Sequence, residues 1–224
     1  MPTSQELVDA IGQSLGAVVQ SGFSTRTAAC DSYEVFVFSL VIDAARRVGA
    51  QISYRSIGIS APFNGQFTFR TGPGNIYSRA YPYTYARIEF SGHGTLEVHV
   101  GIYAAGVSGV RHECDVAVLP FDEAENCRRQ RVHPRCSELW LAAECKFYSS
   151  ELSIDLGRSF LGLVKEIHQD SRFFVTNSSS ETLEKLLAHH KIRWQRKLVP
   201  GNADLVNRLR SLFEEVFQNY LALG

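Results

Sequence analysis

Two runs of apolar residues, at positions 112–119 and 138–148, predict a pair of buried strands in the middle of the chain. The runs read HECDVAVL and ELWLAAECKFY, and polar or proline-containing segments flank both. Side chains alternate between the two faces of a strand, so we expect Glu113 and Asp115 on one face and Cys114 and Val116 on the other. The first run therefore places two acidic side chains together on an otherwise apolar strand.

The second run carries a similar group of charges. Alternation places Glu144 and Lys146 on one face and Cys145 on the other. If the two strands pair, Asp115, Glu144 and Lys146 converge at one end of a sheet. Buried charges of this kind cost several kcal/mol unless a metal ion or an ion pair compensates them.

The pattern of apolar residues over the rest of the chain predicts helices on both sides of a sheet. The spacing of apolar residues, the turn residues and the helix caps predict further strands within residues 51–111. The predicted helices cover 4–20, 31–49, a segment from about Gly157, 181–191 and 203–223. Thr3 or Ser4 would cap the first of them, and Ser178 and Glu181 would form a capping box at the fourth. The predicted strands cover 51–59, 65–72, 84–90, 95–103, 171–179 and 191–200. The closing helix has an apolar stripe that suits core packing or a dimer.

Composition restricts the classes of function. The chain has 224 residues, with 23 basic and 23 acidic side chains and a formal charge of zero, so any site for a polyanion must be local. The amino terminus does not resemble a signal peptide, and no apolar run is long enough to span a bilayer. Five cysteines, two of them inside predicted strands, indicate buried thiols in a reducing compartment. We expect a cytoplasmic protein with no membrane contact.

The pair of charged strands resembles a known signature. An Asp at the end of one strand, followed after a loop by Glu-x-Lys on the next, is similar to the PD-(D/E)xK phosphodiesterase superfamily, the restriction-endonuclease-like nucleases. The matching residues are Asp115, Glu144 and Lys146, with Cys114 in place of the proline. The resemblance extends over residues 31 to 200 and implies an α/β fold with an αβββαβ core. A mixed central sheet would be flanked by helices, with extra antiparallel strands on its N-terminal side.

The resemblance also implies the chemistry of the site. Asp115 and Glu144 would bind Mg²⁺, with Mn²⁺ as the expected substitute, together with the backbone carbonyl of Cys145. The metal would lower the pKa of a bound water, and Lys146 would orient or deprotonate that water. Glu113 or Glu34 would help to hold a second ion. A surface ion pair between Glu144 and Lys146 on an edge strand is the structural alternative.

Glu34 has two interpretations of equal weight. Nucleases of this superfamily often take a metal ligand from a helix that packs on the sheet, which makes Glu34 a candidate ligand. Asp31 and Glu34 also have the spacing of a capping box, with Asp31 in the cap position.

Four arginines follow the first strand of the charged pair. Residues 120–136 are predicted to form a loop, and Arg128, Arg129, Arg131 and Arg135 are its candidate phosphate-binding residues. A solvated run of charge is the alternative. Weaker patterns favour structural roles: the glycines of TGPGN favour a turn, the alternating tyrosines at 81, 83 and 85 favour packing over base stacking, and Cys127, His133 and Cys136 lack the spacing of a zinc site.

These observations favour one domain over residues 1–224, divided into a helix and connector at 1–30, a core at 31–200 and a final helix at 201–224. The expected function is a metal-dependent endonuclease that hydrolyses phosphodiester bonds in DNA, in restriction or defence, with RNA as the other substrate class. It would act as a homo-oligomer or in a larger complex. The alternative is a catalytically silent subunit that binds nucleic acid or assembles a complex.

Overall fold

The strands of the protein form one mixed sheet. The computed structural model describes residues 3–15, 29–59, 61–80, 82–166 and 172–223. Seven strands lie in the order of the sequence: β1 (Gln51–Ser56), β2 (Thr84–Glu89), β3 (Thr95–Ala105), β4 (Arg111–Pro120), β5 (Leu141–Lys146), β6 (Arg172–Thr176) and β7 (Arg193–Gln195). Strands β1 to β5 pair with one another in antiparallel fashion, whereas β6 and β7 run parallel to β5.

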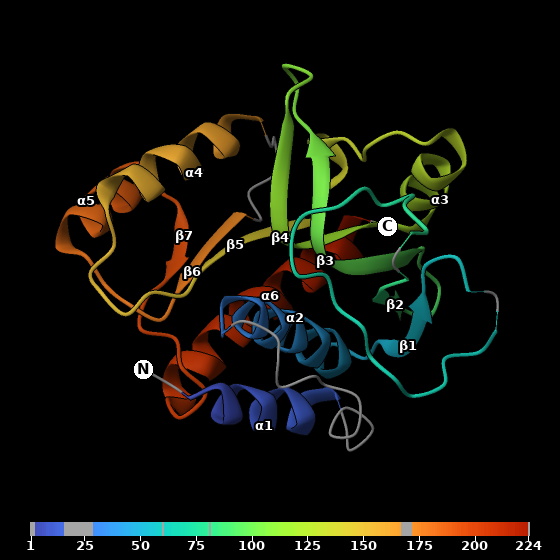
Figure 1. Ribbon diagram of the computed structural model, residues 1–224, viewed down its shortest axis with the longest axis horizontal. Coiled ribbons are helices and arrows are strands. Elements are labelled where there is room, and N and C mark those ends of the chain that lie inside the picture. Colours follow the sequence, from blue (N-terminus) through green and yellow to red (C-terminus); the bar gives the residue numbers. More distant parts are fainter. Residues whose placement is uncertain (1–2, 16–28, 60, 81, 167–171, 224) are drawn as a thin grey trace.

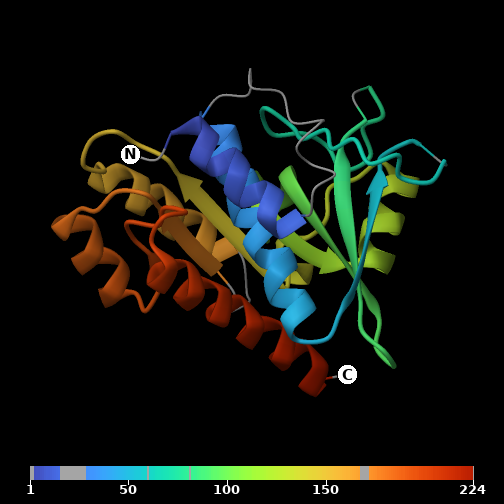
Figure 2. The ribbon, with the colours of Figure 1, turned by 90° about the horizontal axis from the view of Figure 1, so that it is seen from below.

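Helices cover both faces of this sheet, as Figures 1 and 2 show. One face carries α1 (Ser4–Leu15), α2 (Ala29–Arg47) and α6 (Ala203–Leu223), and the other carries α3 (Phe121–Gln130), α4 (Ile154–Glu166) and α5 (Glu181–His189). The predicted α/β class, with a mixed sheet between helices, is confirmed. None of the described helices combines the length and the apolar character that a membrane span requires.

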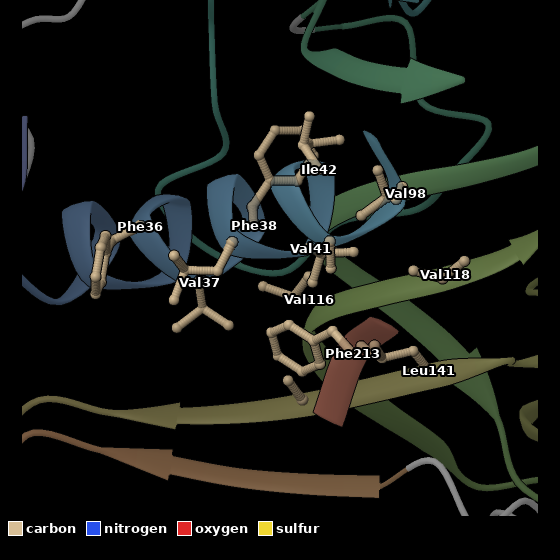
Figure 3. Close-up of a cluster of buried hydrophobic side chains, with 14 of the residues drawn as sticks. Phe36, Val37, Phe38, Val41, Ile42, Val98, Val116, Val118, Leu141 and Phe213 are labelled. Carbon is tan, nitrogen blue, oxygen red and sulfur yellow. The ribbon is translucent and has the colours of Figure 1, made fainter. Parts of the chain in front are cut away.

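The larger apolar core lies between α2, α6 and the middle of the sheet. Figure 3 shows Phe38 and Val41 of α2 beside the strand residues Val98 and Val116, with Phe213 of α6 closing the cluster. Helix α2 is apolar on most sides because α1, α6 and the sheet surround it. The apolar stripe of the last helix therefore packs into the core, which was the first of its two predicted roles.

A bend in strands β3 and β4 divides the core. Gly101 has a φ of +61°, a conformation that favours glycine, and the register of the two strands places it opposite Asp115. Val116 packs in the larger core, but Cys114 packs in a second core beneath α3, α4 and α5. The prediction that Cys114 and Val116 share one face is therefore wrong, because the bend lies between them. Beyond it the two strands project from the sheet as a hairpin (Figure 1).

Several predicted elements differ in extent near the amino terminus. Helix α1 ends at Leu15, and the rest of the predicted segment, 16–20, lies outside the described residues. Thr3 caps this helix, since its hydroxyl accepts a hydrogen bond from the backbone N–H of Glu6. Helix α2 begins at Ala29, two residues before Asp31, so the prediction of Asp31 as a cap residue is wrong. The predicted strand at 65–72 is absent. Within this segment Thr68 exchanges hydrogen bonds with Thr84 at the start of β2: the Thr84 N–H donates to the Thr68 carbonyl, and the Thr68 N–H donates to the Thr84 hydroxyl in place of a backbone carbonyl.

The prediction of a loop at 120–136 is also wrong, because residues 121–130 form α3. Acidic residues in the first turn and arginines in the last complement the helix dipole, and Arg131 ends the helix with a φ of 59°. Its surface is almost entirely polar, so its sequence lacks the apolar stripe that usually reveals a helix. Near the carboxyl terminus, Ser180 caps α5 in place of Ser178, and β7 has only three residues.

Candidate active site

The candidate site lies where the central strands β4 and β5 separate. Their regular pairing ends at Val116 and Ala143, and continuing the register would place Asp115 opposite Glu144. The backbone N–H of Cys145 donates a hydrogen bond of 2.7 Å to Oδ2 of Asp115. The Asp115 side chain thus accepts a hydrogen bond where continued pairing of the two strands would use a backbone carbonyl. The sheet still holds both carboxylates, because β3 pairs with β4 on either side of Asp115 and β6 pairs with β5 at Glu144.

Lys146 joins the two carboxylates. Its Nζ lies 2.5 Å from Oε1 of Glu144 and 3.7 Å from Oδ2 of Asp115. The side chain of Asp115 is 5% exposed, against 19% for Glu144 and 21% for Lys146, so solvent reaches the cluster from the Glu144 and Lys146 side. The predicted convergence of the three residues is confirmed, and the pair lies on a central strand, which rules out the edge-strand alternative.

The electrostatics of the cluster show an excess of negative charge. Burial raises the pKa of Asp115 to about 7, and the neighbouring Glu144 contributes to the rise although Lys146 and the Cys145 N–H oppose it. Burial would lower the pKa of Lys146, but the two carboxylates raise it above its usual value, so the ammonium stays charged. Burial and the charge of Glu144 also raise the pKa of the Glu113 carboxyl. One ammonium therefore faces more acidic groups than it can neutralise.

These groups provide a donor set for a hard divalent cation. Carboxylate oxygens are the preferred ligands of Mg²⁺, which commonly uses only one or two of them and completes its shell with water. Among the described residues no three Asp, Glu, His or Cys side chains are gathered in metal-binding geometry, and Lys146 lies between the two carboxylates. The partly buried Glu34 is near enough to raise the pKa of the Cys145 thiol by its charge.

The chain matches no protein-family model, no curated protein and no solved structure. Any interpretation of the cluster therefore depends on its own geometry and charge. Two carboxylates and an ammonium at a break between central strands can bind a cation, polarise a bound water and exchange a proton near neutral pH.

The raised pKa of Asp115 predicts a pH-dependent stability. The pKa of this carboxyl is about 7 in the fold and about 3.9 in an unfolded chain, so the folded state binds the extra proton. The contribution of this carboxyl to stability should therefore be greatest at acid pH and should decline as pH rises from about 4 to about 7. With EDTA present, we expect the melting temperature of the parent protein to fall between pH 5 and pH 8. The melting temperature of Asp115→Asn should not show this fall, because the asparagine side chain does not ionise.

An exposed carboxylate provides the control for this experiment. Asp155 lies on α4 with 76% of its side chain exposed, so Asp155→Asn should follow the parent protein at both pH values. Equal melting curves for the parent and Asp115→Asn at pH 8 would show that Asp115 carries no buried charge.

The four predicted phosphate-binding arginines are in different environments. Arg128 donates bidentate hydrogen bonds of 2.8 and 2.9 Å to Glu97 and also pairs with Glu125. Its guanidinium is therefore already paired with two carboxylates. Arg135 pairs with Glu123 and Glu138. Arg129 and Arg131 are exposed on α3 and at its end. At about 3.3 Å per residue, the start of α3 lies roughly 20 Å along the chain from Asp115.

A second charged cluster was missed by the sequence analysis. Glu97 and His99 of β3 are fully buried, with Nε2 of His99 3.0 Å from Glu97 and its Nδ1 3.1 Å from the hydroxyl of Tyr83. Burial lowers the pKa of His99, whereas hydrogen bonds from His99 and Arg128 outweigh burial and lower the pKa of Glu97. The signal was present, because Glu97-x-His99 also puts charge on an apolar strand. The predicted packing of Tyr83 and Tyr85 is confirmed, and Tyr81 lies outside the described residues.

Proposed function

We propose that the protein is a metal-dependent phosphodiesterase whose active site contains Asp115, Glu144 and Lys146. The observation that carries the proposal is the excess of carboxylate charge around one ammonium at a break between two central strands. A protein interior tolerates such an excess when a cation compensates it. A structural role alone explains this arrangement poorly, since replacing a buried ion pair by well-packed apolar residues is often neutral or stabilising.

Asp115 and Glu144 would hold the Mg²⁺ ion. The N–H of Cys145 points toward the gap beside Asp115, and in an extended strand the carbonyl of the same residue faces the same neighbour. We therefore expect the Cys145 carbonyl to be the third protein ligand. Glu113 and Glu34, whose charges act on the same group of residues, are the candidate ligands for a second ion.

Lys146 is the group that would act on the water nucleophile. A bound Mg²⁺ would lower the pKa of that water and stabilise charge on the phosphate. The ammonium of Lys146 touches both carboxylates, so it would orient the water and offset the developing charge. The hydrogen bond from the Cys145 N–H keeps Asp115 in position during this step.

The order of elements around the cluster supports the same proposal. Helix α2 is followed by five antiparallel strands, with α3 inserted between β4 and β5, and then by α4 and the parallel strand β6. With β1, β2 and α3 set aside, the remaining elements have the αβββαβ order of restriction-endonuclease-like nucleases. Strands β1 and β2 are additional antiparallel strands on the N-terminal side. DNA is the expected substrate, and RNA is the other candidate.

Calorimetric titration with Mg²⁺ and Mn²⁺ tests whether the cluster binds metal. The parent protein should bind either ion, and Glu144→Gln should weaken binding at least tenfold because a neutral amide replaces a charged ligand. Glu34→Gln distinguishes the two kinds of role for that residue: a ligand to a second ion predicts loss of one binding event, and a structural residue predicts only a shift in melting temperature.

A matched control is an exposed glutamate outside the site. Glu181 of α5 is 80% exposed, and Glu181→Gln should leave the titration unchanged. If the parent protein and Glu144→Gln bind Mn²⁺ equally, the cluster is not a metal site and the proposal fails.

A further inference from the structure

A pair of adjoining cavities lies beside α3. One has a volume of about 580 Å³ and the other about 500 Å³, and both are lined by Arg79, Arg128 and Arg129. Arg131 and Tyr77 complete the larger cavity. We call the two together the arginine groove. It shares no lining residue with the Asp115 cluster.

The arginine groove has a strong positive charge that the protein itself does not neutralise. Among the described residues, Glu125 is the one acidic residue that lines it, and this carboxylate is engaged by Arg128. Arg79 and Arg131 have no side-chain hydrogen bond or ion pair within the described part of the chain, and Arg129 bonds only to the Asn126 amide. Three arginines, Arg79, Arg129 and Arg131, therefore line the groove without an ion-pair partner in the described part of the chain.

The walls of the groove are fixed by contacts behind them. Arg128 is held by two hydrogen bonds to the fully buried Glu97, which His99 supports in turn. Arg79 lies across the turn at Gly58, where a φ of +73° and the close approach of the arginine side chain both favour glycine. Contacts behind the groove therefore fix Arg128 and the stem of Arg79, whereas Arg129 and Arg131 are exposed on α3 and at its end.

We propose that the arginine groove is a binding site for phosphate groups, supplied by a free nucleotide or by a nucleic-acid strand. Planar guanidinium groups bind phosphate oxygens bidentately, and several of them around a cavity suit a ligand with more than one negative charge. The volume lies within the range of small-molecule sites, about 300 to 1,000 Å³. This site is independent of the proposed cleavage at Asp115 and would exist in a protein without nuclease activity.

Binding of pyrophosphate, ATP and a 12-nucleotide single-stranded DNA tests the inference, with EDTA present so that no metal site contributes. The parent protein should bind at least one of these probes saturably, and the double variant Arg79→Gln, Arg131→Gln should bind it at least tenfold more weakly. Its melting temperature should match that of the parent, because neither arginine has a side-chain hydrogen bond or ion pair within the described residues. Arg47→Gln, which changes a 59% exposed arginine on α2, is the matched control and should stay within twofold of the parent.

The three probes also identify the source of the phosphate. Tighter binding of ATP or pyrophosphate than of the oligonucleotide would support the groove as a site for a free nucleotide, and tighter binding of the oligonucleotide, or its binding alone, would support a site for a strand. Failure of all three probes to bind, or equal binding by the parent and the double variant, would overturn the inference.

Discussion

Replacing Lys146 by methionine is expected to reduce the rate of phosphodiester cleavage by at least about a thousandfold, within the range for the loss of a general acid or base. Methionine keeps much of the length of the side chain but has no ammonium to orient the water or offset developing charge. Metal binding should persist or become tighter, because the ammonium no longer lies between Asp115 and Glu144. Single-turnover cleavage and metal titration of the same preparation measure the two effects separately.

A lysine outside the site separates this effect from a general loss of charge. Lys185 of α5 is 76% exposed and pairs with Glu181, so Lys185→Met should cleave at the parental rate. Cleavage by Lys146→Met within tenfold of the parent would remove Lys146 from the mechanism and leave the cluster as a structural ion pair.

Replacing Arg128 by methionine is expected to produce the largest loss of stability among the arginines of α3. The substitution leaves the fully buried Glu97 with His99 and with Arg87, whose Nε lies 3.5 Å away. Removing one partner of a buried pair costs about 3 to 5 kcal/mol. At about 2 to 4 °C per kcal/mol for a chain of this size, the melting temperature should fall by roughly 6 to 20 °C.

Two further variants test the cause of this loss. Arg129→Met on the same helix removes an exposed side chain and should change stability by less than about 0.5 kcal/mol. Adding Glu97→Gln to Arg128→Met should recover part of the stability, because the uncompensated charge disappears. Equal melting temperatures for Arg128→Met and Arg129→Met would contradict the assignment of Arg128 to a buried ion network.

The sequence was sufficient to predict which charged residues of the two central strands meet. Alternation along a strand places Glu144 and Lys146 on one face, and pairing of neighbouring strands brings Asp115 beside them. The sequence could not predict that β4 bends at Asp115, because the cause is Gly101 on another strand. The hydrogen bond from the Cys145 N–H depends on the same break in the pairing.

Long-range pairing also explains what the sequence analysis missed. Helix α3 has no apolar stripe, and the segment at 65–72 has the composition of a strand but does not join the sheet. Arg128 resembles its exposed neighbour Arg129 in sequence, yet it pairs with Glu97, which lies 31 residues away. Arg79 joins the arginine groove only through the folding of the connection between β1 and β2 against α3.

Cleavage of nucleic acid by the purified protein tests the central claim most directly. Supercoiled plasmid, linear duplex DNA and single-stranded RNA are incubated with Mg²⁺ or with EDTA, alongside Glu144→Gln prepared identically. The account predicts cleavage of at least one substrate, DNA foremost, that requires the metal and is lost in Glu144→Gln. Cleavage that persists in EDTA or in the variant, or intact substrates throughout with a correctly folded parent protein, would contradict it.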